Sequence, residues 1–346
     1  MDKAGIDALL VTSLPNVFYL SGFAILPGST AALVVIGDDS YILVDPRFSI
    51  QARAECKEAR VSDYFGISLT MAAVNLIDEL KPGRVGFESE HLTVSSYREL
   101  RKTVHKGIKL RSTCGLVEKL RRVKDEHEIA LIRKACQIAD AAFEAVFFHI
   151  KPGMTEKEVA LLIDTTLRRL GADKEAFETI AASGPNSACP HAIPTDTVLK
   201  RGQLLKLDFG ARYRSYNSDI TRTICLGRPT AKQREVYGIV LEAQRLAIDA
   251  IAPGKSGKEI DAVARDYIAS KGYGDNFGHG LGHALGIEFH DGPAFSKTSD
   301  LILEPGNVLT VEPGIYIEGW GGIRIEDDVL VTDTGADVIT TAVRKL

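Results

Sequence analysis

The sequence has few cysteines and no pattern among them. Its five cysteines include no Cys-x-x-Cys pair, are odd in number and lie far apart, at Cys56, Cys114, Cys136, Cys189 and Cys225. Disulfide frameworks of secreted proteins and thiolate zinc sites need closely spaced or evenly numbered cysteines. The sequence therefore favours free thiols in a reducing compartment and excludes a cysteine-based metal site.

Long hydrophobic runs are also missing. No stretch approaches the roughly 20 consecutive apolar residues that a membrane-spanning helix needs. The first residues, "MDKAGIDALLVTS", contain one lysine and a short apolar run before Pro15, which does not match a signal peptide. We expect a cytoplasmic protein without a membrane partner.

An excess of positive charge is absent as well. The chain has 42 lysines and arginines against 46 aspartates and glutamates, for a formal net charge of −4. Proteins that bind nucleic acid or anionic membranes carry basic patches that raise their net charge. The charge balance therefore predicts no nucleic-acid partner and favours a small or neutral substrate.

The length of the chain predicts two domains, because 346 residues exceed the size at which one hydrophobic core stops growing. In the first 110 residues, β-branched runs predict strands over 8–13, 31–36, 40–44 and 84–89. An amphipathic helix is expected over 70–80, ended by Lys81-Pro82-Gly83. These elements predict a small α/β domain with a mixed sheet.

A basic and polar segment, residues 111–128, follows this domain, and a strongly periodic helix is expected over 128–150. Charge runs of this kind are most often solvated helix faces, and we interpret the segment that way. The domain boundary is placed inside it, giving an N-terminal domain over 1–118 and a second domain over 119–346.

The second domain contains an internal repeat. "KPGMTEKEVALLIDTTLRRLG" (151–171) recurs as "APGKSGKEIDAVARDYIASKG" (252–272), and "KRGQLLKLDFG" (200–210) recurs as "EPGNVLTVEPG" (304–314). A period of this length is too long for a solenoid. It predicts two similar α+β halves related by a pseudo-two-fold axis, with equivalent residues meeting at the centre.

Four acidic residues lie in apolar strand runs of the two halves. Asp208 and Asp219 belong to the first half, and Glu312 and Glu326 belong to the second, with Asp208 and Glu312 at equivalent positions of the repeat. An unpaired buried carboxylate is very costly, so positive charge must lie beside them. Two nearby arginines, Arg222 and Arg324, could neutralise only two of the four acids.

One or two divalent cations fit the charge count better than arginines alone. Carboxylates with one imidazole and no thiolate suit Mn²⁺, Co²⁺, Zn²⁺ or Fe²⁺, and two such ions would form a hydrolytic site. The segment "FGHGLGHALGIEFHD" (277–291) supplies an imidazole, and we predict that His283 is the nitrogen ligand. Its four glycines favour an extended or looped backbone. A glycine-rich turn with incidental histidines is the alternative.

The motifs "SGPNSACPHAIPTD", "LDFGARYRSYNSDITRT", "HGLGH", "VLTVEPGIYI" and "GGIRIEDDV" together resemble those of the pita-bread metallopeptidases, specifically Xaa-Pro aminopeptidase and Xaa-Pro dipeptidase (prolidase). The beginning of the chain, with "GIDALLVTSLPNVFYLSGF", is similar to the creatinase/prolidase N-terminal domain. The resemblance covers nearly the whole chain. It implies a creatinase/prolidase-like N-terminal domain followed by a pseudo-two-fold pita-bread catalytic domain.

The resemblance also implies roles for individual residues. Asp219 and Glu326 would bridge two metal ions, Asp208 would chelate one ion, and His283 with Glu312 would complete the other. His191 and His290 would stabilise the reacting carbonyl. Glu312 would also act as a proton shuttle. His279 and Arg324 would line the substrate pocket. For His279 the alternative is an imidazole bonded only to a backbone carbonyl. Ser215 stands where relatives usually have glycine.

The implied activity is metal-dependent hydrolysis of the bond before proline. We favour an Xaa-Pro aminopeptidase, which releases the first residue of a longer peptide, with an Xaa-Pro dipeptidase as the alternative. A non-catalytic pita-bread binding protein is a remote alternative, because such proteins usually lose ligands that this chain keeps. The resemblance further implies two divalent ions, with Mn²⁺ expected and Co²⁺ or Zn²⁺ as alternatives, and a homodimer formed through the N-terminal domain.

Overall fold

The computed structural model describes residues 1–26 and 28–346, which form two compact units, Met1–Leu120 and Arg121–Leu346. The boundary placed from the sequence lies two residues before this division, and the short helix α5 (Glu118–Arg122) runs across it. Each unit has its own hydrophobic core.

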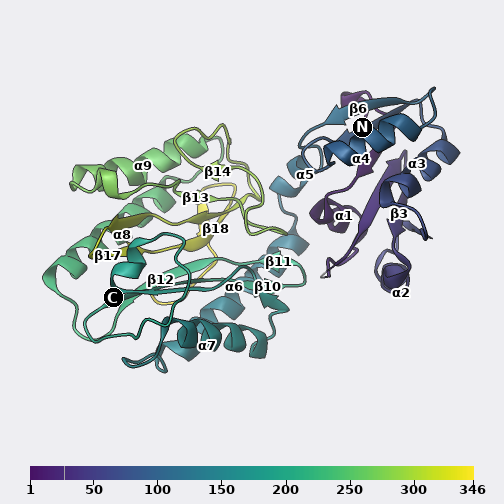
Figure 1. Cartoon of the computed structure of the whole chain (residues 1–346). Helices are drawn as coiled ribbons and strands as arrows, with labels where there is room; N and C mark the ends of the chain where they lie inside the picture. The colour runs from purple at the N-terminus through teal and green to yellow at the C-terminus, as the bar shows by residue number, and fades with distance from the viewer. Residues whose placement is uncertain (27) are drawn as a thin grey trace. The chain divides into compact units, whose positions relative to one another are not determined.

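The first unit is built on a six-stranded sheet with the strand order β4-β3-β2-β1-β5-β6 (Figure 1). Strands β1, β2 and β3 pair antiparallel, whereas β1 with β5, β5 with β6 and β3 with β4 pair parallel. The strands are β1 (Ala8–Val11), β2 (Ala31–Ile36), β3 (Asp39–Val44), β4 (Arg60–Asp63), β5 (Arg84–Glu88) and β6 (Lys109–Thr113). The mixed sheet is confirmed, but both edge strands, β4 and β6, were missed because their sequences are polar and largely exposed.

Helices cover both faces of this sheet. One core cluster includes residues of α1 (Leu14–Ser21) and α2 (Ser49–Glu55), and the other includes residues of α3 (Leu69–Leu80) and α4 (Val94–Thr103). Helix α3 begins after Ser68, whose side chain accepts a hydrogen bond from the Met71 N–H, and ends at Lys81 with a left-handed backbone. The predicted end of this helix is confirmed.

The second unit repeats one plan, a helix pair followed by antiparallel strands. The helix pairs are α6 (Glu126–Phe147) with α7 (Glu156–Arg169) and α8 (Ala231–Ala250) with α9 (Gly257–Ser270), and Figure 1 shows them outside the central strands. Helices α7 and α9 begin with equivalent capping boxes, Thr155 with Glu158 and Ser256 with Glu259. The predicted repeat is therefore present down to the helix caps.

The strands of each half form small antiparallel sheets. The first half contains β7 (Lys174–Glu175), β8 (Ile180–Ser183), β9 (Leu204–Phe209), β10 (Ala211–Tyr213), β11 (Tyr216–Asn217) and β12 (Ile220–Cys225). The second half contains β13 (Gly282–His283), β14 (Ala294–Phe295), β15 (Val308–Val311), β16 (Gly314–Ile317), β17 (Gly321–Arg324), β18 (Asp327–Val331) and β19 (Ala336–Val338). Strand β9 lies between β8 and β12, and β18 lies between β15 and β19.

The two halves meet along β12 and the segment from β17 to β18. The Glu326 N–H donates to the Thr221 carbonyl at 3.1 Å, and the Thr223 hydroxyl donates to the Arg324 carbonyl at 2.9 Å. Acidic residues at the ends of these strands are therefore brought to the centre of the unit, as the repeat predicted.

The interpretation of residues 111–128 as a solvated helix face is wrong for three charged residues, although Arg111, Lys119 and residues 125–127 are exposed. The segment contains strand β6 and the five-residue helix α5, and the side chains of Arg121 and Lys124 are each only 1% exposed. Glu128 is also buried and accepts a hydrogen bond from the Tyr216 hydroxyl at 2.9 Å. A charge run gives no sign of partners that lie far away in the sequence, and here such partners bury these three side chains.

Ser215 lies in the two-residue turn of the β10–β11 hairpin. Both turn residues have positive φ, 46° at Arg214 and 73° at Ser215, and Tyr213 pairs with Tyr216 across the turn. Two positive φ values are characteristic of a type I′ turn, where glycine is preferred at the second position. The turn thus forms with serine in place of the usual glycine, and Asp219 lies just beyond it.

Candidate metal centre

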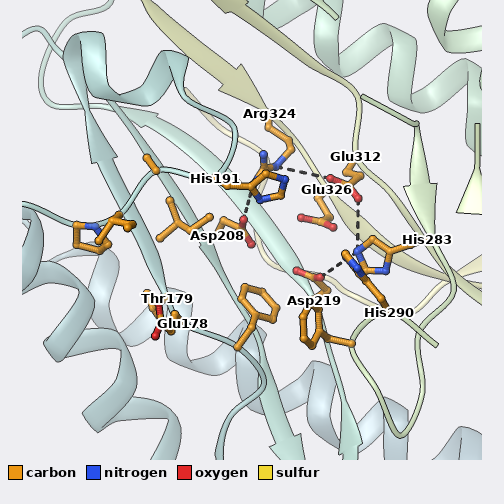
Figure 2. Close-up of a pocket in the computed structure, with 16 residues that line it drawn as sticks. Glu178, Thr179, His191, Asp208, Asp219, His283, His290, Glu312, Arg324 and Glu326 are labelled. Carbon is orange, nitrogen blue, oxygen red and sulfur yellow. Dashed lines mark hydrogen bonds and ion pairs between the residues drawn. The ribbon is translucent and has the colours of Figure 1, made fainter. Parts of the chain in front are cut away.

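Four carboxylates converge where the two halves meet (Figure 2). Asp208 is on β9, Asp219 precedes β12, Glu312 follows β15, and Glu326 lies between β17 and β18. Asp208, Asp219 and Glu326 are 6%, 4% and 2% exposed, so water screens their charges poorly. The carboxylate cluster predicted from the repeat is present.

His283 completes the cluster from the glycine-rich segment. Its Nε2 atom is 3.5 Å from Asp219 Oδ2 and 3.5 Å from Glu312 Oε1. Ligand atoms of Asp219, His283 and Glu326 all lie within 4.8 Å of one another. The backbone here is a two-residue strand between looped segments, as expected from the glycines, and Gly282 is required because a Cβ would lie 1.9 Å from the Thr310 carbonyl oxygen.

Arginine does not balance the four acids. Arg324 pairs with Asp208 and lies 3.9 Å from Glu312, but Arg222 pairs with Asp327 at 2.7 Å on the opposite side of β12. Alternate residues of a strand face opposite sides, so Thr221 faces the cluster and Arg222 faces away. Within the described ranges, Arg324 and His283 form ion pairs with Asp208, Asp219 and Glu312, and no ion pair reaches Glu326.

Two observations indicate that the cluster is built for cations. Asp219 Oδ1 is buried and has no hydrogen-bond partner in the described structure. Burial, reinforced by the neighbouring carboxylates, raises the pKa values of Asp219 and Glu326 well above the usual range, and burial also raises the pKa of Glu312. Oxygen ligands with one imidazole and no thiolate fit hard or borderline divalent ions.

Metal affinity is expected to rise with pH. The raised pKa values of Asp219 and Glu326 mean that the metal-free site still holds protons above the ordinary pKa of a carboxyl group, and a cation must displace them. Each displaced proton makes the dissociation constant fall by about tenfold per pH unit. Calorimetric titration with Mn²⁺ in buffers of different ionisation enthalpy counts the protons; binding without proton release at any pH would contradict this prediction.

The remaining contacts of the carboxylates come from hydroxyl groups. The Thr221 hydroxyl donates to Glu326 Oε2 at 2.5 Å and accepts from Arg324 Nε at 2.9 Å. The Thr310 hydroxyl accepts from the His283 N–H at 3.0 Å and donates to Glu312 Oε1 at 3.2 Å. Thr221 therefore holds Glu326 from the neighbouring strand β12, and Thr310 holds Glu312 from two residues earlier in the same strand run.

His279 lies beside the cluster and is bonded at both ring nitrogens. Nδ1 is 2.7 Å from the Gly280 carbonyl oxygen, and Nε2 is 2.9 Å from the Tyr316 hydroxyl. Burial, reinforced by Arg324, lowers the pKa of His279 to about 4, so the ring is neutral. The alternative of an imidazole bonded to a backbone carbonyl is thus partly correct, and Tyr316 takes the other nitrogen.

Arg324 is also fully engaged. Besides Asp208 and Thr221, it donates from Nη1 to the Tyr316 hydroxyl at 2.9 Å and to the Pro190 carbonyl at 3.2 Å. Its side chain is 3% exposed. The guanidinium therefore ties together the two halves and the segment before His191.

A cavity opens onto the cluster, and His191 and His290 line it. Apolar side chains form its outer wall, and Figure 2 shows the two imidazoles facing the carboxylates. The lining residues include Phe177, Ile180, Ile193, Pro194 and Phe289. A second lobe shares His191, His283, His290, Glu312 and Arg324 with the first and adds His279, Gly280 and Ser296. The structure thus brings every site residue predicted from the sequence to one cavity with two lobes.

Two residues of this centre were not predicted from the sequence, Tyr316 and Lys206. Lys206 is buried and donates to the carbonyls of Cys189 and Pro190 at 2.6 and 2.9 Å. The available signal was its position two residues before Asp208 in the apolar strand "LLKLDF", which places both side chains on one face. Tyr316 carried no comparable signal, because tyrosine is common in strands.

Comparisons with known proteins agree with this arrangement. Residues 130–333 match the model of metallopeptidase family M24, and residues 1–123 match that of the creatinase/prolidase N-terminal domain. An Xaa-Pro dipeptidase from Pyrococcus horikoshii is 41% identical over 100% of this chain and 96% of its own length. The match therefore includes both domains.

Solved structures give the same result. An Xaa-Pro dipeptidase from Bacillus anthracis has a TM-score of 0.94 at 41% identity, covering 100% of this chain and 96% of the other. An X-Pro aminopeptidase from Thermotoga maritima MSB8 has a TM-score of 0.91 at 39% identity, covering 99% and 97%. The predicted combination of the two domain types is confirmed.

Proposed function

The chain belongs to metallopeptidase family M24, and from this premise we propose that it is a metal-dependent Xaa-Pro dipeptidase. The observation that carries the proposal is the convergence of four carboxylates and one imidazole, with an unpartnered Asp219 oxygen, at the floor of a cavity. The sequence alone favoured the aminopeptidase. The names of the relatives support its alternative, the dipeptidase, better.

The proposed ligands are Asp208, Asp219, His283, Glu312 and Glu326. The four carboxylates among them carry four negative charges, which two divalent ions balance, and their oxygens and nitrogen are the donors that Mn²⁺ accepts. Two bound ions would polarise the scissile carbonyl and lower the pKa of a water molecule. The non-catalytic alternative has less support, because this chain keeps the whole set.

Glu312 is the proposed proton carrier. Its side chain is 15% exposed, against 6% for Asp219, so it can contact a water molecule in the cavity. It would take the proton from the attacking water and return it to the proline nitrogen as the carbon–nitrogen bond breaks. That nitrogen carries no hydrogen in the substrate, so a delivered proton is needed for it to leave as an amine.

His191 and His290 are the proposed donors to the reacting carbonyl oxygen. Burial, reinforced by His283 and His191, lowers the pKa of His290 to about 4, so a neutral ring would donate from one nitrogen. Donors aimed at a developing oxyanion contribute about 10²–10³ in rate. His279 would support the pocket through Tyr316 and Arg324 rather than contact substrate directly, because both of its nitrogens are bonded.

One observation favours the Xaa-Pro aminopeptidase as the second candidate. A dipeptidase must bind the free carboxylate of the proline residue, and among the described lining residues of both lobes Arg324 is the only lysine or arginine. Since Arg324 is already engaged, an Xaa-Pro dipeptide would have to use histidines or backbone donors for its carboxylate.

Substrate length separates the two candidates. We expect Ala-Pro to be cleaved with a kcat/KM at least about tenfold above that of Ala-Pro-amide and Ala-Pro-Pro, because a hydrogen bond to a charged group contributes about 1.5–3 kcal/mol and tenfold corresponds to about 1.4 kcal/mol. Ala-Ala serves as the control for the proline requirement. Preferred cleavage of Ala-Pro-Pro would replace the dipeptidase by the aminopeptidase, and no metal-dependent cleavage of any of these peptides would reject both.

Three further properties stay predictions: manganese as the bound ion, a homodimeric assembly and a cytoplasmic location. The first is supported by the donor set and the second by the family resemblance. Among the described residues, no helix combines the length and the hydrophobicity needed to cross a membrane.

A further inference from the structure

The loop that carries His290 is held by buried charges outside the metal centre. This His290 loop, residues 284–293, leaves β13 directly after His283 and returns to β14. Its ends are joined by hydrogen bonds from the Asp291 N–H to the Ala284 carbonyl at 2.8 Å and from the Ala284 N–H to the Pro293 carbonyl at 3.1 Å. The loop brings the His290 ring to 4.0 Å from the His283 ring, centroid to centroid, beside the carboxylate cluster (Figure 2).

Asp291, the neighbour of His290, turns inward and closes the loop. Its Oδ2 atom accepts a hydrogen bond from the Ile287 N–H at 3.1 Å, and its side chain is 4% exposed. Gly286 makes room for it, because a Cβ there would lie 2.0 Å from Asp291 Oδ2 and 3.1 Å from Lys124 Cε. The loop is therefore folded around this carboxylate.

The charges that face Asp291 come from the first residues of the second unit. Arg121 donates from Nη2 to Asp291 Oδ1 and, at 2.8 Å, to Glu288 Oε2. Lys124 Nζ lies 3.8 Å from Asp291 Oδ2 and makes no hydrogen bond in the described structure. Two buried cations thus face one buried anion, which is costly unless the geometry is maintained.

The segment that supplies these cations is itself anchored. The Lys124 N–H donates to the Gly306 carbonyl at 2.9 Å, and Asn307 Nδ2 donates to the Arg122 carbonyl at 3.2 Å. On the other side of the loop, Asn217 Nδ2 donates to the Gly286 and Ile287 carbonyls at 3.1 and 2.8 Å. Two sets of contacts therefore hold the loop. One consists of the Asn217 hydrogen bonds, and the other consists of the ion pairs of Asp291 with Arg121 and Lys124.

We propose that Asp291, held by Arg121 and Lys124, is a positioning residue that fixes the His290 imidazole against the reacting carbonyl. This inference rests on the proposed function, because it assigns His290 a contact with substrate. Asp291 itself faces away from the metal centre, towards Arg121, and is not among the residues that line either lobe of the cavity. It therefore acts on the reaction only through the loop.

The test is a double-mutant cycle between Asp291→Asn and His290→Ala. In an otherwise wild-type chain, we expect Asp291→Asn to lower kcat on Ala-Pro by about 10–100-fold, the range for residues that orient active-site groups. KM should change by less than about threefold, and metal content should stay the same. In the His290→Ala background, the same substitution should change kcat by less than about twofold. An equal loss in both backgrounds, or no loss in the wild type, would overturn the inference.

Glu288→Gln is the matched control, because Glu288 contacts the same Arg121 but is 46% exposed. We expect it to keep kcat within about twofold. If Asp291→Asn does not fold, Lys124→Met takes its place in the cycle. We expect its effect on kcat to depend on His290 in the same way, and an equal loss of kcat in both backgrounds would again contradict the proposal.

Hydrogen exchange separates this inference from the proposed function. Amides of residues 286–291 should exchange faster in Asp291→Asn than in Glu288→Gln, whatever substrate the protein cleaves. Faster exchange in a protein that cleaves no Xaa-Pro peptide would reject the function and support the anchoring. Unchanged exchange would reject the anchoring even in an active enzyme.

Discussion

Asp219→Asn is expected to abolish tight metal binding and to lower kcat/KM on Xaa-Pro substrates by roughly 1,000-fold or more, since even residues that only orient metal ligands cost 10–100-fold. Asp219 is 4% exposed, its Oδ2 atom is 3.5 Å from His283, and its Oδ1 atom has no partner in the described part of the protein. An amide at this position has one oxygen instead of two and carries no charge. The measurement is elemental analysis of the dialysed variant together with its steady-state kinetics.

The metal-free form of the same variant should unfold at a temperature no lower than the metal-free wild type. Burial and the neighbouring Asp208, Asp328 and Glu312 raise the pKa of Asp219, so its charge is unfavourable in the metal-free fold. Removing that charge reduces the repulsion between the carboxylates. An undiminished unfolding temperature would therefore show that the variant has lost a metal ligand and is still folded. Asp266→Asn, the same change at an exposed position, is the control and should keep full activity. A fully active Asp219→Asn enzyme would refute the site.

Removing the metal from the wild type should lower its melting temperature by roughly 5–10 °C. A ligand present at 100 times its dissociation constant stabilises the fold by about 2.7 kcal/mol, and 1 kcal/mol corresponds to about 2–4 °C in a domain of 150–250 residues. At high pH the melting temperature should fall by more than about 5–10 °C, because the unneutralised carboxylates of Asp219 and Glu326 then repel each other. Differential scanning calorimetry with and without chelator measures it.

Asp219→Asn supplies the matched control for this experiment as well. Since the variant holds no tightly bound metal, chelator should leave its melting temperature unchanged within about 1 °C, which is a quarter to a half of the shift that 1 kcal/mol gives in a domain of 150–250 residues. Equal shifts in both proteins would mean that the chelator acts elsewhere, and no shift in the wild type would mean that the cluster does not hold metal in the folded protein.

The metal centre could be predicted from the sequence because its acidic residues lie within apolar strand runs, where carboxylates are rare. Asp208 in "LLKLDF" and Glu312 in "VLTVEPG" interrupt runs that otherwise read as buried strands, and the repeat pairs them across the two halves. A buried charge requires a partner of opposite charge, so these acids predict a bound cation independently of the family resemblance. The structure brings these residues together with His283 from a segment whose glycines allow close approach.

The parts that could not be predicted depend on contacts between distant residues. Arg121 and Lys124 read as solvated, but Asp291, some 170 positions away, buries them. Strands β4 and β6 are polar because they form the edges of a sheet, and only pairing with β3 and β5 defines them. Arg222 lies three residues from Asp219 and Arg324 two residues from Glu326, and the alternation of side chains along the folded strands makes Arg324 face the acids and Arg222 face away.

The measurement that tests the central claim most directly is stepwise return of Mn²⁺ to chelator-stripped protein, with bound metal and Ala-Pro hydrolysis determined on the same samples. The five-residue centre predicts that hydrolysis is absent without metal and reaches its maximum at two ions per chain. A maximum at one ion would contradict the two-ion site, and two bound ions without hydrolysis of any Xaa-Pro peptide would contradict the proposed function.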